Sequence, residues 1–141
     1  EAKAKMLDGN WASTDNFSIG LVTNSPQPTA AAGTPQYADF TDIGTAGNYT
    51  AGGEVLDTLA NLVTELNGVM TFDDTGADYV VLQHASNPAT AAWAIVYNST
   101  DAGDDAVCFI DLTTDGGTTA IDMTAGDLTV TWAATGLFTI T

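Results

Sequence analysis

Residues 17–23 read FSIGLVT, and this stretch decides the fold class because apolar side chains alternate there with small or polar ones. A repeat of two residues is typical of a β-strand that buries one of its faces. Turn-forming clusters of Gly, Asn, Asp and Ser separate further strand-like stretches, which recur about every ten residues. We expect these strands at 69–72, 79–83, 91–97, 106–112, 118–122, 128–132 and 137–140. Short strands at such spacing predict one all-β domain over residues 13–141, an antiparallel sandwich or barrel-like fold.

The N-terminal segment, residues 1–12, differs from this β-rich domain in composition. Good helix formers occupy 2–7, and a helix-ending Asp-Gly-Asn cluster follows them, so we expect a short N-terminal helix. The two basic side chains of the chain, Lys3 and Lys5, both lie here. This segment is therefore a candidate for docking on another molecule.

Residues 54–67 allow two interpretations. Apolar side chains recur at a spacing of three to four residues, which favours an amphipathic helix that ends at Asn67-Gly68. The recurring residues are Leu56, Leu59, Leu62, Val63 and Leu66. A strand is the alternative, with a less regular apolar pattern on its face. That face would carry Ala60, Leu62, Thr64 and Leu66.

Two stretches are expected to lie outside the main strands. Prolines, a glycine and a run of alanines at 24–34 interrupt regular structure, so we predict a long surface loop suited to contact with a neighbouring subunit. Residues 37–43 carry aromatic or apolar side chains at every third position and precede several glycines. This pattern predicts a short edge element flanked by turns.

Charge limits the partners of this chain. It has 18 acidic and 2 basic side chains, and its formal net charge is -16. Nucleic acids and anionic membranes are excluded as partners of so acidic a surface, because binding them requires positive side chains. Salt should stabilise the fold by screening repulsion between like charges. Apolar runs are too short for a membrane span and the first residues lack the apolar core of a signal peptide, so we expect a soluble protein.

A hydrophobic fraction of 45% predicts a folded domain rather than a disordered chain. The expected core consists of apolar residues from the later strands. They are Trp93, Ile95, Tyr97, Val107, Phe109, Leu128, Val130, Trp132, Phe138 and Ile140. Trp11 lies outside every predicted element, so the pattern does not assign it to the core.

Groups for catalysis or metal binding are sparse. Cys108 is the only cysteine and lies in the apolar run AVCFI, so we expect a buried structural thiol, and the only histidine, His84, is remote in sequence. Aspartates at 73–78 and 101–111 could offer oxygen ligands to calcium, but no stretch fits the calcium loop with its closing glutamate. We expect no catalytic residue, no metal site and no cofactor.

Five segments resemble a family of small structural proteins of tailed bacteriophages. They are AKMLDG at 4–9, IGLVT at 19–23, YTAGGEVL at 49–56, AWAIVYN at 92–98, and GDLTVTW at 126–132 followed by Gly136. The segments occur in the same order as in the family and span nearly the whole chain. The lack of lysine and arginine after Lys5 departs from what we expect of that family.

The resemblance implies a non-enzymatic virion protein, a capsid decoration or cement protein that binds the outside of the major capsid shell. Its partners would be the major capsid protein and copies of itself, as a homo-oligomer on the virion, and the free chain would lie in the host cytoplasm during assembly. The resemblance also favours strands over a helix after Gly53. Candidate interface residues come from the N-terminal segment and the proline-rich loop. They are Lys3, Lys5, Met6, Leu7, Trp11, Pro26 and Pro28.

Three alternatives remain open at this point. A tail, baseplate or fibre-associated module of the same virion shares the resemblance but differs in copy number. A carbohydrate-binding β-sandwich predicts exposed aromatic rings along a groove, with Trp11, Tyr49 and Tyr79 as candidates. An acidic hydrolase, the weakest of the three, requires two carboxylates at a fixed separation in a cleft.

Overall fold

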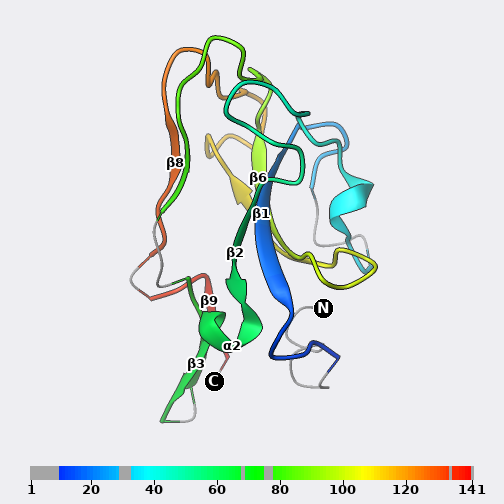
Figure 1. The fold of residues 1–141 in the computed structure, drawn as a ribbon, viewed down its shortest axis with the longest axis vertical. Helices are drawn as coiled ribbons and strands as arrows, with labels where there is room; N and C mark the ends of the chain where they lie inside the picture. Colours follow the sequence, from blue (N-terminus) through cyan, green and yellow to red (C-terminus); the bar gives the residue numbers. More distant parts are fainter. Residues whose placement is uncertain (1–9, 29–32, 68, 75–77, 134, 141) are drawn as a thin grey trace.

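A computed structural model describes residues 10–28, 33–67, 69–74, 78–133 and 135–140. Nearly all of its regular structure is antiparallel β, which confirms the all-β, sandwich-like fold class (Figure 1). The short helix expected at 2–7 lies outside the described residues.

The largest sheet has four strands in the order β2-β1-β6-β7. Their bounds are β1 (Asn16–Val22), β2 (Glu54–Thr58), β6 (Trp93–Asn98) and β7 (Ala106–Asp111). Each neighbouring pair is antiparallel. β1 and β6 therefore lie in the middle of the sheet, and β2 forms one edge.

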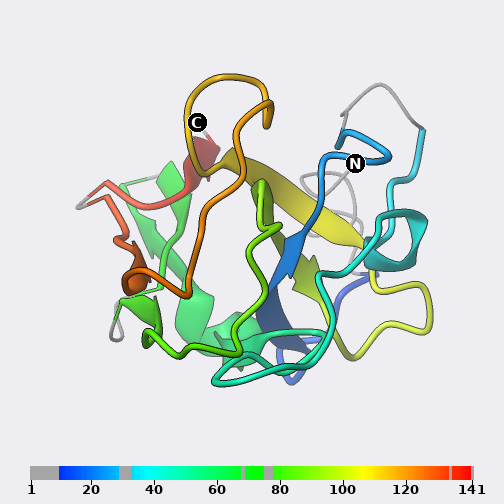
Figure 2. The same ribbon diagram turned by 90° about the horizontal axis from the view of Figure 1, so that it is seen from above.

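Two smaller antiparallel sheets complete the fold. One has the order β3-β4-β9, and the other pairs β5 with β8. Their bounds are β3 (Val63–Leu66), β4 (Val69–Phe72), β5 (Tyr79–Val81), β8 (Leu128–Val130) and β9 (Phe138–Ile140). Seen from above, the strands of all three sheets lie around a common interior (Figure 2).

A hydrophobic cluster fills this interior and joins the sheets. The Phe17 ring of β1 meets the Phe72 ring of β4 edge to face, with centroids 5.4 Å apart, and meets the Trp11 ring in the same way at 5.2 Å. Buried residues of β5, β6 and β8 belong to the same cluster. Trp11, which the sequence pattern does not assign to the core, is only 4% exposed.

A second cluster covers the opposite face of the four-stranded sheet. Tyr37, at the start of the 3-10 helix η1 (Tyr37–Asp39), stacks on Tyr97 with ring centroids 4.3 Å apart. The Tyr37 ring also lies so close to Gly20 that a Cβ there would collide with it. The expectation that 17–23 buries only one face is therefore wrong, because residues of β1 are buried on both.

The helical interpretation of 54–67 is wrong for most of its length. The chain forms β2, a four-residue helix α2 (Leu59–Leu62) and then β3. Leu62 is buried whereas Leu66 is 72% exposed, so the repeating leucines do not share one buried face. In this segment β2 pairs with β1, and β3 pairs with β4. Such strand pairing often overrides the helical periodicity of a short stretch of sequence.

Other expected elements are confirmed or corrected individually. The stretch 118–122 is not a strand, and only the isolated bridge between Ala91 and Ile121 occurs there. At 37–43 the short element is η1 followed by a single bridge from Asp42 to β1. No helix in the described part of the chain has the length and apolar character needed to cross a membrane.

Eight residues of the predicted core can be placed by their side chains. Those that are buried are Ile95, Tyr97, Leu128 and Val130. Those that are partly buried against the two clusters are Trp93, Val107, Phe109 and Trp132. The side chains of Phe138 and Ile140 lie outside what the structure describes.

Candidate docking groove

A groove runs between the edge strand β2 and the strand β5. It consists of two neighbouring hollows of about 200 and 180 Å³, which share Glu54 and Tyr79 in their walls. The lining residues lie at 48–50 and 53–57 on one side, and at 74 and 78–81 on the other. We call this feature the β2–β5 groove.

The groove follows the outer edges of two strands. β2 is the edge of the four-stranded sheet, and β5 belongs to a sheet of two strands. The lining residues that lie in strands belong to β2 and β5, and no described lining residue belongs to their paired strands, β1 and β8. Backbone groups along such edges are available to pair with an added polypeptide strand.

Tyr49 forms part of the groove wall and is fixed by Asp42 and by β1. Its hydroxyl donates a hydrogen bond to Asp42 Oδ2 at 2.9 Å and accepts one from the Leu21 N–H at 2.9 Å. Tyr37 donates a second hydrogen bond to the same carboxylate oxygen. Burial raises the pKa of Tyr49 and of Tyr37 well above the ordinary range, so both phenols stay neutral and keep donating.

The turn that leads into β2 is held by the same network. The Gly52 N–H donates to Asp42 Oδ2 at 2.9 Å, and the Gly52 carbonyl accepts from the Tyr97 hydroxyl at 2.7 Å. Gly53 follows with a φ of 76°, and a Cβ there would collide with the carbonyl oxygen of Ile19. Only glycine combines this left-handed conformation with such close packing. The start of β2 is thereby fixed against the sheet.

Asn87 ties the two walls together at one end of the groove. Its side-chain Oδ1 accepts from the Asn48 N–H at 2.7 Å, and its Nδ2 donates to the carbonyl of Leu82, just after β5, at 2.8 Å. The same Nδ2 donates to the Met123 carbonyl at 3.1 Å. The Asn87 side chain is 5% exposed, so these are buried bonds that few alternative partners could replace.

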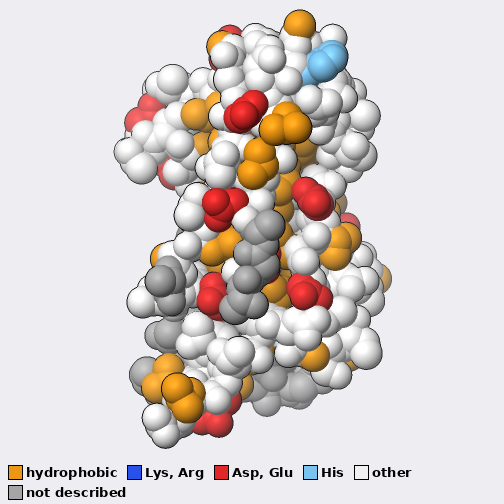
Figure 3. Space-filling view, turned by 60° about the vertical axis from the view of Figure 1, so that its left-hand side comes forward, with side chains coloured by type: hydrophobic (Ala, Val, Ile, Leu, Met, Phe, Trp, Pro, Cys, Tyr) orange, Lys and Arg blue, Asp and Glu red, His pale blue; other side chains and the backbone are white. Residues whose placement is uncertain are grey.

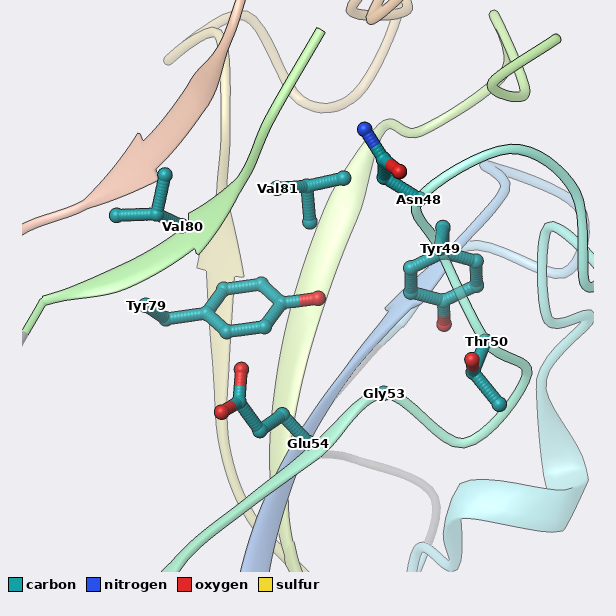
Figure 4. A pocket seen from close by; sticks show the side chains of 8 residues that line it. All are labelled: Asn48, Tyr49, Thr50, Gly53, Glu54, Tyr79, Val80 and Val81. Carbon is teal, nitrogen blue, oxygen red and sulfur yellow. The ribbon is translucent and has the colours of Figure 1, made fainter. Parts of the chain in front are cut away.

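Tyr79 projects from β5 into the groove, on the side where Glu54 reaches up from β2 (Figure 4). Its side chain is 5% exposed and lies in the wall that the two hollows share. Burial, and then the negative charges of Glu54 and Asp42, raise the pKa of Tyr79. The groove therefore contains a phenol that stays neutral.

The walls of the groove are acidic, with Glu54, Asp57, Asp74 and Asp78 among the lining residues. A hydrogen bond from the Asn61 amide and a second from the Thr58 N–H lower the pKa of Asp57, which keeps that carboxylate ionised. A space-filling view of this side shows hydrophobic side chains in a line with acidic side chains on both sides of it (Figure 3).

The interface residues expected from sequence are not assembled into this groove as far as the structure describes them. Lys3, Lys5, Met6 and Leu7 lie outside the described residues. Trp11 is in the core and borders a separate apolar hollow beside α2. In the proline-rich loop, Pro26 is exposed and Pro28 is buried.

The carbohydrate-binding alternative places Tyr49 and Tyr79 along a groove, and both line this one, although neither is exposed as that alternative expects. The sequence does not indicate a groove between two strand edges, because its walls are far apart in the chain. The aspartates around Asp74 and Asp78 were considered only as calcium ligands, and Glu54 was considered only as part of a resembling segment. Acidic residues within an apolar strand, as at Glu54 and Asp57, are a signal of an exposed edge that could have indicated the site.

Groups for catalysis are few in the described part of the chain. Cys108 is half-buried, and burial raises the pKa of its thiol to about 12, which makes it a poor nucleophile. The ring of His84 accepts a hydrogen bond from the Ser86 N–H at 3.1 Å. No group of three or more His, Cys, Asp or Glu side chains within the described ranges is arranged to hold a metal ion.

Comparison of the chain with protein-family models, with curated proteins and with solved structures found no match.

Proposed function

We propose that this chain is a non-enzymatic virion protein of a tailed bacteriophage, a capsid decoration or cement protein that binds the outside of the major capsid shell and stabilises it. The observation that supports the proposal is the β2–β5 groove. Edge strands form much of its walls, and its described lining residues are not arranged as a catalytic site. Open strand edges recognise polypeptide, so this site suits assembly better than chemistry.

The segments that resemble the phage family form the framework around this site. IGLVT lies in β1, AWAIVYN in β6 and GDLTVTW around β8. YTAGGEVL supplies the turn at Gly52 and Gly53 and the beginning of β2, where the resemblance favoured a strand. Four of the five resembling segments thus lie in or beside β1, β2, β6 and β8, and AKMLDG lies outside the described residues.

The carbohydrate-binding alternative is less well supported. Stacking on a sugar requires an aromatic face that solvent can reach. Trp11, Tyr49 and Tyr79 are 4%, 2% and 5% exposed, respectively, so none of the three offers such a face. A tail or baseplate module remains compatible with the same groove and differs from the decoration protein in its neighbours and copy number.

Binding to capsids tests the proposal. The purified chain is mixed with shells from its source virus that lack it, and occupancy is measured after the shells are separated from free protein. We expect saturable binding to the outside of the shell and a higher temperature of shell disruption, because a ligand that binds the assembled state stabilises that state. Binding to tails but not to shells, or to neither, would contradict the decoration role.

The positive segment provides a second readout of the same proposal. If Lys3 and Lys5 contribute to attachment, the double variant Lys3→Glu and Lys5→Glu should occupy fewer sites on the shell while its circular dichroism spectrum stays unchanged. Unchanged occupancy would remove these lysines from the shell interface.

A further inference from the structure

We propose that the apolar hollow beside α2 binds residues 1–9 of the same chain, with Met6 and Leu7 against its lining and a lysine beside Glu65 at its rim. The volume of the hollow is about 310 Å³. Its lining residues are Trp11, Ser13, Leu59, Ala60, Val63 and Met70. The inference concerns the folded chain by itself, so it goes beyond the virion proposal and does not rest on it.

Backbone hydrogen bonds hold the walls of this hollow together. The described chain begins beside α2, and the first N–H groups of that helix donate to it (Figure 1). The Leu59 N–H donates to the Asp15 carbonyl at 2.8 Å, and the Ala60 N–H donates to the Ser13 carbonyl at 3.0 Å. β3 follows α2 directly and pairs with β4, which carries the remaining lining residue. The hollow is therefore built into the fold.

The lining favours an apolar occupant over water. Five of the six lining residues have apolar side chains. A water molecule takes about 30 Å³ in the liquid, so roughly ten waters would fit here, and few of them would find a polar partner in the wall. Apolar side chains that cover the hollow remove this surface from water, which stabilises the covered state. Residues 1–9 supply two large apolar side chains, Met6 and Leu7.

Trp11 in the wall of the hollow gives an independent sign of a missing partner. Its side chain is 4% exposed, and its buried Nε1 has no hydrogen-bond partner within the described residues. Buried polar groups nearly always have a partner, and an indole N–H can only donate. The Nε1 of Trp93, in contrast, donates to Asn24 Oδ1 at 2.9 Å. A backbone carbonyl of the bound segment would supply the acceptor that Trp11 lacks.

Charge complementarity at the rim fits the same segment. Glu65 of β3 is directly opposite Met70 of β4 in the antiparallel register, so their side chains share one face of the hairpin. Val63, two residues before Glu65, projects from that face too. Since Val63 and Met70 line the hollow, the exposed Glu65 carboxylate lies at its rim. The two basic side chains of the chain both lie in residues 1–9, within reach of this carboxylate when the segment is bound.

Chain connectivity selects the segment of the same molecule. Trp11, which lines the hollow, is the second described residue, so residues 1–9 join the domain at the hollow itself. Leu7 is four residues away, a reach of at most about 14 Å in an extended chain. The Asp-Gly-Asn cluster at 8–10 favours a turn that would bring the segment back. A tethered segment has a high effective concentration, whereas a second copy, with a net charge of -16, would first have to overcome mutual repulsion.

Nuclear Overhauser effects in the full chain test the contact directly. We expect cross-peaks from the methyl groups of Met6 and Leu7 to the side chains of Val63 and Met70. A mixture of isotope-labelled and unlabelled chains separates contacts within one molecule from contacts between two, and we expect only the former.

The Trp11 indole provides a second readout. In Met6→Asp with Leu7→Asp, its N–H should exchange with solvent about tenfold faster than in the wild type, because the cover and the acceptor are lost. Ala2→Asp with Ala4→Asp is the matched control, since it adds the same charge to the same segment, and its effect should be less than about twofold. The Trp93 indole, bonded to Asn24, should exchange at the same rate in all three chains.

A charge reversal tests the contact at the rim. Glu65→Lys should speed exchange of the Trp11 indole N–H by about two- to fivefold, as expected for loss of an exposed ion pair. Adding Lys3→Glu and Lys5→Glu to this variant should restore slow exchange. Ala38→Lys with Ala102→Lys changes the net charge by the same amount at two exposed positions outside the hollow, and should leave the rate unchanged.

Several results would overturn the inference. Methyl signals of Met6 and Leu7 without cross-peaks to the hollow exclude it, and cross-peaks only between molecules would assign the hollow to a second copy instead. Equal exchange rates in the Asp variants and their control exclude Met6 and Leu7 as the cover of Trp11. Because these readouts involve no capsid, their failure is distinct from a failure of shell binding.

Discussion

The Asp42 carboxylate accepts a hydrogen bond from the Tyr49 hydroxyl at 2.9 Å, and this pair connects the groove wall to the centre of the main sheet. The same hydroxyl accepts from the backbone N–H of Leu21 in β1. Asp42 also binds the N–H of Gly52, where the chain turns into β2. One carboxylate therefore sets the position of both the aromatic wall and the edge strand.

Tyr49→Phe should lower the free energy of unfolding by about 1–3 kcal/mol, because it leaves the buried Leu21 N–H and one Asp42 interaction without a partner. Chemical denaturation of the variant and the wild type measures this difference. Tyr79→Phe is the matched control, and its stability should stay within about 0.5 kcal/mol of wild type. Equal losses in the two variants would contradict the assigned networks.

Asn87→Ala should destabilise the fold by about 2 kcal/mol or more, since it removes three side-chain hydrogen bonds, to Asn48, Leu82 and Met123. Thermal unfolding should show a melting temperature lower by several degrees, at about 3 °C for each kcal/mol. Asn61→Ala, which removes an exposed amide that donates to Asp57, should cost less than about 1 kcal/mol. A neutral effect of Asn87→Ala would mean that the groove end is not held in this way.

The four tyrosines predict the behaviour of the fold in alkali. Desolvation by burial is the largest cause of the raised pKa of Tyr37, Tyr49, Tyr79 and Tyr97. The folded state therefore holds these phenols neutral, while the unfolded chain ionises near its ordinary value of 10.0. The stability from this difference is fully present below pH 10 and is lost as pH rises above it. Tyrosinate absorbance should consequently increase together with loss of the circular dichroism signal, and a gradual titration of the folded protein near pH 10 would contradict this burial.

Salt should stabilise this domain. With 18 acidic and 2 basic side chains, the folded surface repels itself, and added salt screens interactions beyond about 10 Å at 0.1 M. We expect the melting temperature to rise with sodium chloride concentration. The Ala38→Lys and Ala102→Lys variant should show a weaker rise, because it carries less excess charge. A melting temperature that is flat or falls with salt would show that self-repulsion is not significant.

The sequence predicts the strands well where side chains alternate over a full element. The strands predicted at 17–23 and 91–97 correspond to β1 and β6, and the ends of each agree within two residues. The alternation does not reveal how many faces are buried, because that depends on Tyr37, which the next segment of the chain places over β1 at Gly20. From the sequence, Gly20 is compatible with a strand buried on one face or on both. In the structure the Tyr37 ring packs against Gly20, so the second face is buried as well.

The pattern fails where pairing competes with local periodicity. Leucines at 56, 59, 62 and 66 repeat like a helix, yet β2 and β3 gain partners in two different sheets, and only α2 remains helical. The groove is unpredictable for a related reason. Its walls meet only after β2 and β5 take their places in separate sheets, and the hydrogen bond from the Asn48 N–H to Asn87 at one end of the groove spans 39 residues.

The copy number of this chain in purified particles from its source, measured against the major capsid protein by quantitative mass spectrometry, tests the virion proposal most directly. A decoration protein predicts a number comparable with that of the major capsid protein, as expected of a subunit repeated over the whole shell. A small ring-like number would contradict shell decoration and indicate a neck, tail or baseplate module, and absence from the particles would contradict any virion role.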